Sequence, residues 1–95
     1  MQRELKLVEE FHKKFKVLVS DKPSLIPKDR SSNRYGLMRD EVEEYLKGVQ
    51  SGDLENIAKE LADILYAVYG TILEHGLQDI IEEIFEEVHR SNMSK

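Results

Sequence analysis

The chain has 95 residues, 40% of them apolar and 35% charged, a size and composition that fit one small folded domain, residues 1–95. The formal net charge of −5 argues against a nucleic-acid partner, and the lack of cysteine excludes a disulfide framework. No stretch approaches the roughly 20 apolar residues of a membrane span, so we expect a cytoplasmic protein that binds neither membrane nor nucleic acid.

The first predicted helix runs from about Glu4 to Leu18. Its apolar residues recur at steps of three and four, which is the helical period: Leu5, Val8, Phe11, Phe15 and Leu18. Residues 20–33 hold both prolines of the chain, and proline cannot continue a helix. We therefore expect a loop there.

The second helix is predicted to begin at Ser32 or Asn33, because either residue is a good N-terminal cap. Its apolar stripe is Met38, Val42, Tyr45, Leu46 and Val49. The sequence QSGD ends it, and Asp53 in that sequence is expected to cap the next helix.

The third helix is predicted from Leu54 to Glu74, with a stop at His75 and Gly76. It is apolar over most of its circumference, and its small Gly70 would let another backbone approach closely. Four short helices in one copy can hardly cover it. We therefore expect a homodimer, or a dimer of dimers, with this helix near the shared core.

The fourth helix is predicted from Gln78 to Arg90. Four apolar residues at helical spacing are expected to face inward: Ile81, Ile84, Phe85 and Val88. The four helices and the absence of strand-period alternation predict an all-α fold.

Two pairs of carboxylates stand at helical spacing. Glu41 and Glu44 share a face of the second helix, and Glu60 and Asp63 share a face of the third. The short connection makes the two helices antiparallel neighbours, so the pairs can face one another. Two unit charges about 4 Å apart repel by roughly 4 kcal/mol at an effective dielectric near 20. A bound cation would relieve this repulsion, and oxygen ligands favour Mg²⁺ or Mn²⁺.

A solvated helix face would explain the first pair alone. It explains the second pair poorly, because Glu60 and Asp63 lie among Leu61, Ala62 and Ile64. We interpret the two pairs together as a site where protein-bound metal meets the phosphates of a substrate.

The paired motif resembles the signature of the all-α nucleoside triphosphate pyrophosphohydrolases, the MazG-like superfamily. The sequence ELADILYAVYG is similar to the third helix of that family, and EVHRSNMSK resembles the end of its phosphoribosyl-ATP pyrophosphohydrolase-like branch. Asp40 stands where the family often has glutamate, which gives it at most a supporting role. Members of this branch tend to continue beyond the Asn-to-Lys phrase, so we leave open a truncation at the C-terminus.

The resemblance implies a four-helix fold completed by dimerisation, with the second and third helices antiparallel around the carboxylates. It implies hydrolysis of a nucleoside triphosphate between the α and β phosphates. The catalytic and metal-binding residues would be Glu41, Glu44, Glu60 and Asp63, with Glu41 as a candidate base. Phosphate donors would be Asn92, Lys95 and Arg34. Candidates for the slot that holds the nucleobase are His12, Tyr35, Phe11 and Phe15, although the two phenylalanines also suit the core.

Two other interpretations remain open. Glu86 and His89 have the spacing used in di-iron bundles, which need two copies of that motif. The chain could also be a non-catalytic acidic helical dimer that acts as an interaction module or nucleotide sensor. The stability of such a module would not respond to Mg²⁺ or Mn²⁺.

Overall fold

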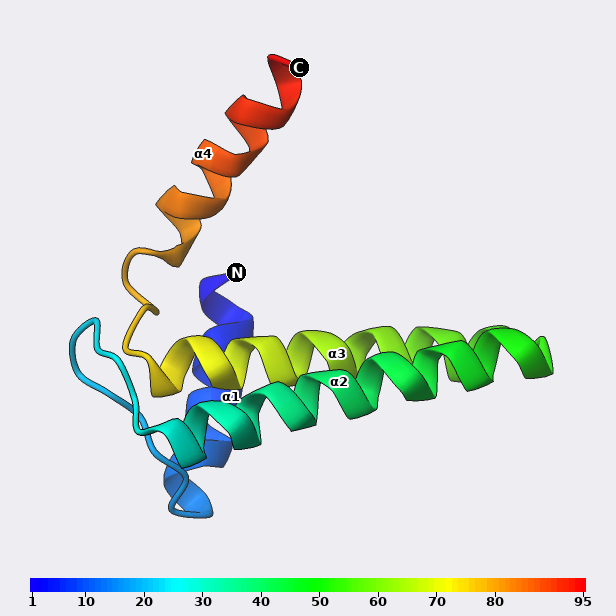
Figure 1. The fold of residues 1–95 in the computed structure, drawn as a ribbon, viewed down its shortest axis with the longest axis horizontal. Helices are drawn as coiled ribbons and strands as arrows, with labels where there is room; N and C mark the ends of the chain where they lie inside the picture. The colour runs from blue at the N-terminus through cyan, green and yellow to red at the C-terminus, as the bar shows by residue number, and fades with distance from the viewer.

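The computed structural model describes residues 1–95 and consists of helices joined by loops, with no strand. Helix α1 spans Gln2–Lys14, α2 spans Lys28–Ser51, α3 spans Leu54–Glu74 and α4 spans Ile81–Met93. In Figure 1, α2 and α3 lie side by side, α1 runs across them near the end of α3, and α4 points away. The predicted all-α class and the four helices are thus confirmed. No helix is both long and apolar enough to cross a membrane.

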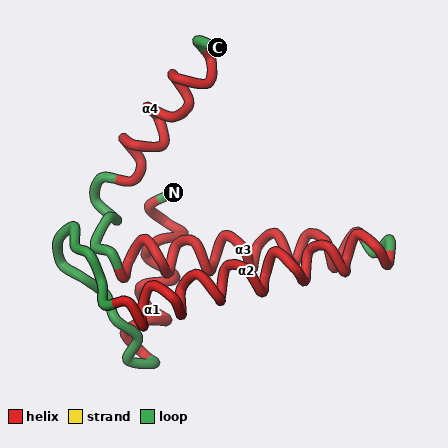
Figure 2. The backbone as a smooth tube through the Cα atoms, in the orientation of Figure 1, coloured by secondary structure: helices red, strands yellow, loops and turns green.

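The tight connection between α2 and α3 makes them an antiparallel hairpin. Gly52 adopts φ 70°, its N–H donates to the carbonyl oxygen of Val49, and the N–H of Asp53 donates to that of Gly48. The Asp53 side chain accepts a hydrogen bond from the N–H of Asn56, as predicted for a cap. Figure 2 shows this turn alone at one end of the hairpin, with the two longer connections at the other end.

Three of the predicted helices have wrong bounds. Helix α1 ends at Lys14 rather than Leu18, because Lys16 turns the chain with φ 58°. Helix α2 begins at Lys28 rather than Ser32 or Asn33, because Pro27 is its cap and suits a helix start, where no N–H is needed. Helix α4 covers Ile81–Met93 rather than Gln78–Arg90, because residues 78–80 form a turn.

The apolar core lies where α1 crosses the end of α3. Only three apolar residues are buried there, namely Leu5, Val8 and Leu73. Partly buried residues from the N-terminus, the first long loop, α3 and the start of α4 pack around them: Met1, Val19, Tyr69, Ile72 and Ile81. The far half of the α2–α3 hairpin, which carries Val49 and Leu54, has no such cover.

Within one chain, the predicted inward stripe of α4 is exposed. Ile84, Phe85 and Val88 are 45%, 61% and 53% exposed, so this expectation was wrong for a single copy. Only the first turn of α4 is anchored, by Ile81 against the core and by Glu82, whose carboxylate lies 3.9 Å from the ammonium of Met1. An amphipathic pattern predicts that a face is covered, but it does not say which chain covers it.

The stop after α3 depends on the glycine at position 76. Gly76 has φ 68°, and a Cβ there would overlap the backbone of Lys22. We expect Gly76→Ala to destabilise the fold by more than about 1 kcal/mol, because both the dihedral and the contact oppose a side chain. Gly36→Ala is the control. Gly36 lies within α2, where a Cβ would make only an ordinary contact with Arg39 Nη2 at 3.9 Å. The substitution should therefore stabilise the fold by about 0.5–1 kcal/mol. Urea unfolding measures the stability of both variants. Equal midpoints for Gly76→Ala and Gly36→Ala would contradict the predicted destabilisation.

Candidate metal centre and its cavity

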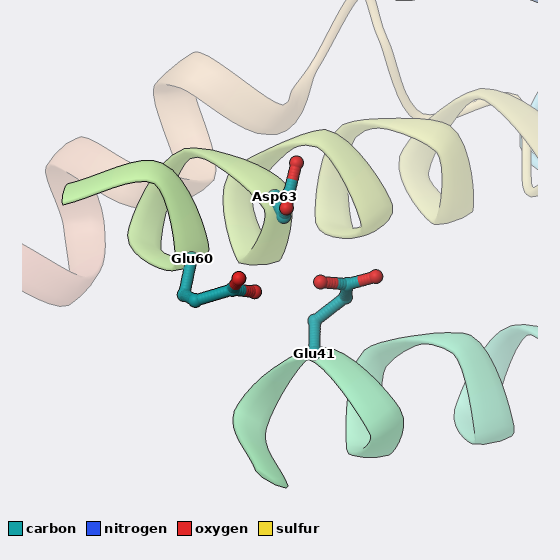
Figure 3. A group of neighbouring side chains, drawn as sticks. All are labelled: Glu41, Glu60 and Asp63. Carbon is teal, nitrogen blue, oxygen red and sulfur yellow. The ribbon is translucent and has the colours of Figure 1, made fainter. Parts of the chain in front are cut away.

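Three carboxylates from two helices converge on one point. Glu60 and Asp63 on α3 face Glu41 on α2, and one oxygen from each residue lies within 4.8 Å of the others (Figure 3). The hairpin produces this geometry, since each residue occupies the inner edge of its helix. Three such oxygens suit a hard divalent cation, which accepts carboxylate ligands and completes its shell with water and phosphate. The donor set therefore fits Mg²⁺ or Mn²⁺.

The electrostatics of this cluster oppose its full ionisation in the absence of metal. Partial burial, then the charges of Asp63 and Glu60, raise the pKa of Glu41 above its ordinary value. Glu60 is 6% exposed. The ammonium of Lys59 lies 3.0 Å from Asp63 and 3.6 Å from Glu60, and these contacts raise the pKa of Lys59. Lys59 thus supplies a counter-charge at the rim of the cluster.

Glu44, the fourth predicted ligand, is not among the converging groups. Its carboxylate is exposed and lies 3.2 Å from the ammonium of Lys47, one turn further along α2. Asp40 is likewise exposed and pairs with Arg39 at 3.3 Å. The structure therefore brings together three of the four predicted ligands.

A cavity of about 400 Å³ opens beside the cluster, with Glu41 and Asp63 in its lining. Its apolar walls include Leu37, Phe11 and Tyr66, and the two rings meet edge to face with centroids 5.7 Å apart. This volume lies within the range of small-molecule sites.

The lining of the cavity becomes basic along α2. Arg30 and Arg34 line it, and they precede Glu41 by eleven and seven positions. At 1.5 Å per residue, Arg30 lies about 16 Å along the helix from Glu41. The cavity therefore has two chemically different ends, one with carboxylates and one with arginines. A molecule that carries phosphates at one end only would have a preferred direction in it.

Both arginines are held by one buried carboxylate, Glu74. Arg30 donates Nε and Nη2 to the two oxygens of Glu74 at 3.0 and 2.8 Å, and Arg34 Nη1 lies 3.1 Å from Oε2. Arg34 also donates Nε to Thr71 Oγ1 and Nη2 to the carbonyl of Ala67. All three nitrogens of Arg34 thus have protein acceptors. Arg34, which was predicted to donate to phosphate, lines the cavity with its nitrogens engaged by these acceptors.

His12 is 3% exposed and lines the same end of the cavity. Its Nδ1 lies 3.1 Å from the carbonyl oxygen of Leu18. Burial lowers the pKa of His12, and the neighbouring Arg34 lowers it further. Gly70 makes room for both side chains, since a Cβ there would lie 2.9 Å from His12 Nε2 and would also overlap Arg34. The predicted close approach at Gly70 is thus made by two side chains rather than by another backbone.

Other predicted site residues lie outside the cavity. Tyr35 is 61% exposed, with the guanidinium of Arg39 over its ring. Phe15 is exposed and stacks on Phe11. Asn92 and Lys95 lie exposed at the far end of α4, which points away from the hairpin (Figure 1). His89, the candidate di-iron ligand, does not belong to the converging carboxylate group.

Sequence reasoning did not identify Arg30, Asn33, Glu74 or Tyr66 as residues of the site. A signal for Glu74 was present, because an acidic residue in the last turn of a helix opposes the helix dipole and needs a cation nearby. Arg30 had no such signal, because it was placed in the loop before α2.

Comparison with known proteins identifies a family for the chain. The model of the family described as phosphoribosyl-ATP pyrophosphohydrolase matches residues 8–92. These residues include the three converging carboxylates and every cavity residue described above. No curated protein matches the chain.

Proposed function

Because the chain belongs to the phosphoribosyl-ATP pyrophosphohydrolase family, we propose that it hydrolyses a nucleoside or deoxynucleoside triphosphate between the α and β phosphates, with Mg²⁺ as cofactor. Membership by itself makes the protein a hydrolase of a nucleotide pyrophosphate bond. The proposal adds the substrate class, the metal and the products, which are a nucleoside monophosphate and pyrophosphate.

The observation that carries the proposal is the junction of the carboxylate cluster with the cavity. Glu41 and Asp63 belong to both. A nucleotide that places its phosphates at the cluster would extend its nucleoside along α2, against the wall that Phe11 and Tyr66 form. The length and polarity of the cavity suit that orientation.

Each charged side chain at the cluster has a proposed role in the reaction. Glu41, Glu60 and Asp63 would hold the divalent ion, which supplies positive charge to the phosphate oxygens and acidifies a coordinated water. The pKa of Glu41 is raised, and Glu41 is the candidate for accepting a proton from the attacking water. Lys59 at the rim can pair with phosphate oxygens once its carboxylate partners are engaged.

A panel of nucleotides tests the proposed reaction. Pyrophosphate release would be measured with Mg²⁺ for ribo- and deoxyribonucleoside triphosphates and for phosphoribosyl-ATP, the substrate named in the family description. Turnover of phosphoribosyl-ATP alone would replace the proposed substrate class with that one. Binding without turnover of any nucleotide would favour the alternative, a nucleotide sensor.

Metal binding should appear in the thermal stability of the protein. At Mg²⁺ about 100 times its dissociation constant, we expect the free energy of unfolding to rise by about 2.7 kcal/mol. Glu41→Gln should lose most of this gain. The metal-free variant should be more stable than the metal-free wild type at neutral pH, because the raised pKa of Glu41 means that its ionised form is disfavoured in the fold.

The direction in which stability changes with pH follows from the raised pKa of Glu41. Between the ordinary value and the raised pKa of Glu41, the folded state binds more protons than the unfolded state. The stability of the metal-free protein should therefore decrease as pH rises through this window. The Mg²⁺ gain should change in the opposite direction, because protons compete with the ion. Melting curves across pH, with and without Mg²⁺, measure both trends, and a Mg²⁺ gain that is independent of pH would contradict the assignment.

We also propose that two copies associate through the uncovered apolar faces. Leu7 on α1 and Leu54, Leu61 and Leu65 on α3 are 49%, 76%, 47% and 52% exposed. Next to them is an almost wholly apolar hollow of about 180 Å³, lined partly by Leu7 and Leu65. Monomers rarely leave such continuous apolar surface uncovered. In such an assembly, Asn92 on α4 and Lys95 just after it could reach the site of another copy. A dimer of dimers is a further proposed assembly.

Leu65→Glu should shift the molecular mass in solution from dimer to monomer, because it places a charge in the covered face. Leu25→Glu is the matched control, since Leu25 is 97% exposed in a loop. Light scattering after size exclusion measures both. A wild type of monomer mass would overturn the proposed association.

A further inference from the structure

Lys59 is the one basic side chain in an ion pair with the converging carboxylates. Its ammonium lies 3.0 Å from Asp63 Oδ2 and 3.6 Å from Glu60 Oε1. Both of these residues belong to the group of three proposed metal ligands. Lys59 therefore holds two carboxylates that the ion also needs.

In this position Lys59 opposes a metal ion at the cluster. Mg²⁺ binds carboxylate oxygens directly, so an ion there would lie close to the ammonium that contacts the same two residues. Two positive charges at such a separation repel each other. Glu60 is only 6% exposed, so water screens its contact with Lys59 less than it screens a surface pair. The affinity for Mg²⁺ is reduced as long as Lys59 stays on these carboxylates.

The Lys59 side chain is nevertheless free to turn. It is 69% exposed, and its only ion pairs and side-chain hydrogen bond are those with Asp63 and Glu60. Lysine carries its charge on a flexible four-carbon chain, and its ammonium pairs with phosphate oxygens. Asp63 belongs both to the cluster and to the cavity lining. An ammonium in contact with Asp63 is therefore close to any phosphate held at the cluster.

We propose that Lys59 couples metal binding to phosphate binding, a role that rests on the function proposed above. Without a phosphate ligand, Lys59 neutralises Asp63 and Glu60 and opposes the ion. When phosphate binds, Lys59 turns to a phosphate oxygen and leaves both carboxylates to the ion. Metal and phosphate then each raise the affinity for the other by the same factor, as thermodynamic linkage requires. The site thereby takes up its metal together with its substrate.

Lys59→Met tests this coupling by calorimetric titration with two ligands, Mg²⁺ and inorganic pyrophosphate. Pyrophosphate is a proposed product and carries no nucleoside, so the result does not depend on the base. We expect the variant to bind Mg²⁺ alone at least about 5-fold more tightly than the wild type does. At saturating Mg²⁺ it should bind pyrophosphate at least about 5-fold more weakly. Without metal, its affinity for pyrophosphate should match that of the wild type, because Lys59 is then engaged by the carboxylates.

Two control variants isolate the role of the Lys59 charge. Lys47→Met removes a lysine that is also 69% exposed and lies 3.2 Å from Glu44, outside the converging group, so both affinities should stay at the wild-type values. Lys59→Arg keeps the charge and should also stay close to wild type, because a guanidinium pairs with carboxylates and phosphates. A Lys59→Arg protein that behaves like Lys59→Met would overturn the role of the charge. Melting curves establish that each variant is folded.

The outcomes separate this coupling from the proposed reaction. Unchanged Mg²⁺ affinity in Lys59→Met would overturn the coupling, and so would a wild type that does not bind pyrophosphate at saturating Mg²⁺. An equal loss of pyrophosphate affinity with and without Mg²⁺ would overturn it as well, because Lys59 would then act as a fixed charge. If the expected changes appear but no nucleotide of the panel releases pyrophosphate, the coupling stands and only the proposed reaction is overturned.

Discussion

Asp63→Asn is expected to lower kcat/KM for pyrophosphate release by about 1000-fold. The substitution removes one of the three charges that would hold the cation, and it preserves the shape of the side chain. Its effect on folding should be small, because Asp63 is partly exposed and its ion pair with Lys59 lies at the surface. Pyrophosphate release at saturating Mg²⁺, together with a melting curve, measures the two effects separately.

The comparison with Glu44→Gln distinguishes a site of three carboxylates from one of four. In the structure, Glu44 pairs with Lys47 and stays outside the converging group. A much smaller loss in Glu44→Gln would support the group of three. An equal loss would support the sequence prediction that Glu44 also holds metal. Unchanged turnover in Asp63→Asn would contradict the site altogether.

Glu74→Gln is expected to cost about 3–5 kcal/mol of the free energy of unfolding, which is the range for removing one partner of a buried ion pair. Glu74 is 0% exposed and is shared by Arg30 and Arg34. Without its charge, the guanidinium of Arg34, itself 7% exposed, stays buried without compensation. Domains of this size are often only marginally stable, so the variant should be largely unfolded at physiological temperature.

Glu43→Gln is a suitable control for Glu74→Gln, because Glu43 is exposed on the same hairpin. Circular dichroism during urea unfolding should give a midpoint close to wild type for Glu43→Gln and a much lower one for Glu74→Gln. A small difference between the two would mean that the acceptors that Arg34 already has, Thr71 Oγ1 and the carbonyl of Ala67, are enough to hold it.

The carboxylate cluster could be predicted from the sequence because its geometry is local. The spacing of Glu60 and Asp63 places them on one face of a helix, and the short Gly52–Asp53 turn forces α2 back along α3. Glu41 then meets them without any contribution from the rest of the fold. Glu44 has the same spacing from Glu41, but the sequence does not reveal that its side chain lies with Lys47.

The basic end of the cavity could not be predicted in this way. Arg30 and Glu74 are 44 positions apart, and their contact depends on where α2 begins and on how the loop after α1 returns to α3. A start at Ser32 or Asn33 leaves Arg30 in a loop with no defined direction. The direction of α4 could not be predicted from the sequence either, since its apolar stripe does not identify the surface that covers it.

The small number of buried apolar side chains has a practical consequence for assays. With only Leu5, Val8 and Leu73 enclosed in one chain, much of the stabilising burial in the proposed assembly would come from association. The folded fraction would then depend on total protein concentration. Activity per molecule should fall on dilution to low nanomolar stocks and return on concentration, so turnover numbers for this enzyme need to be compared at one protein concentration.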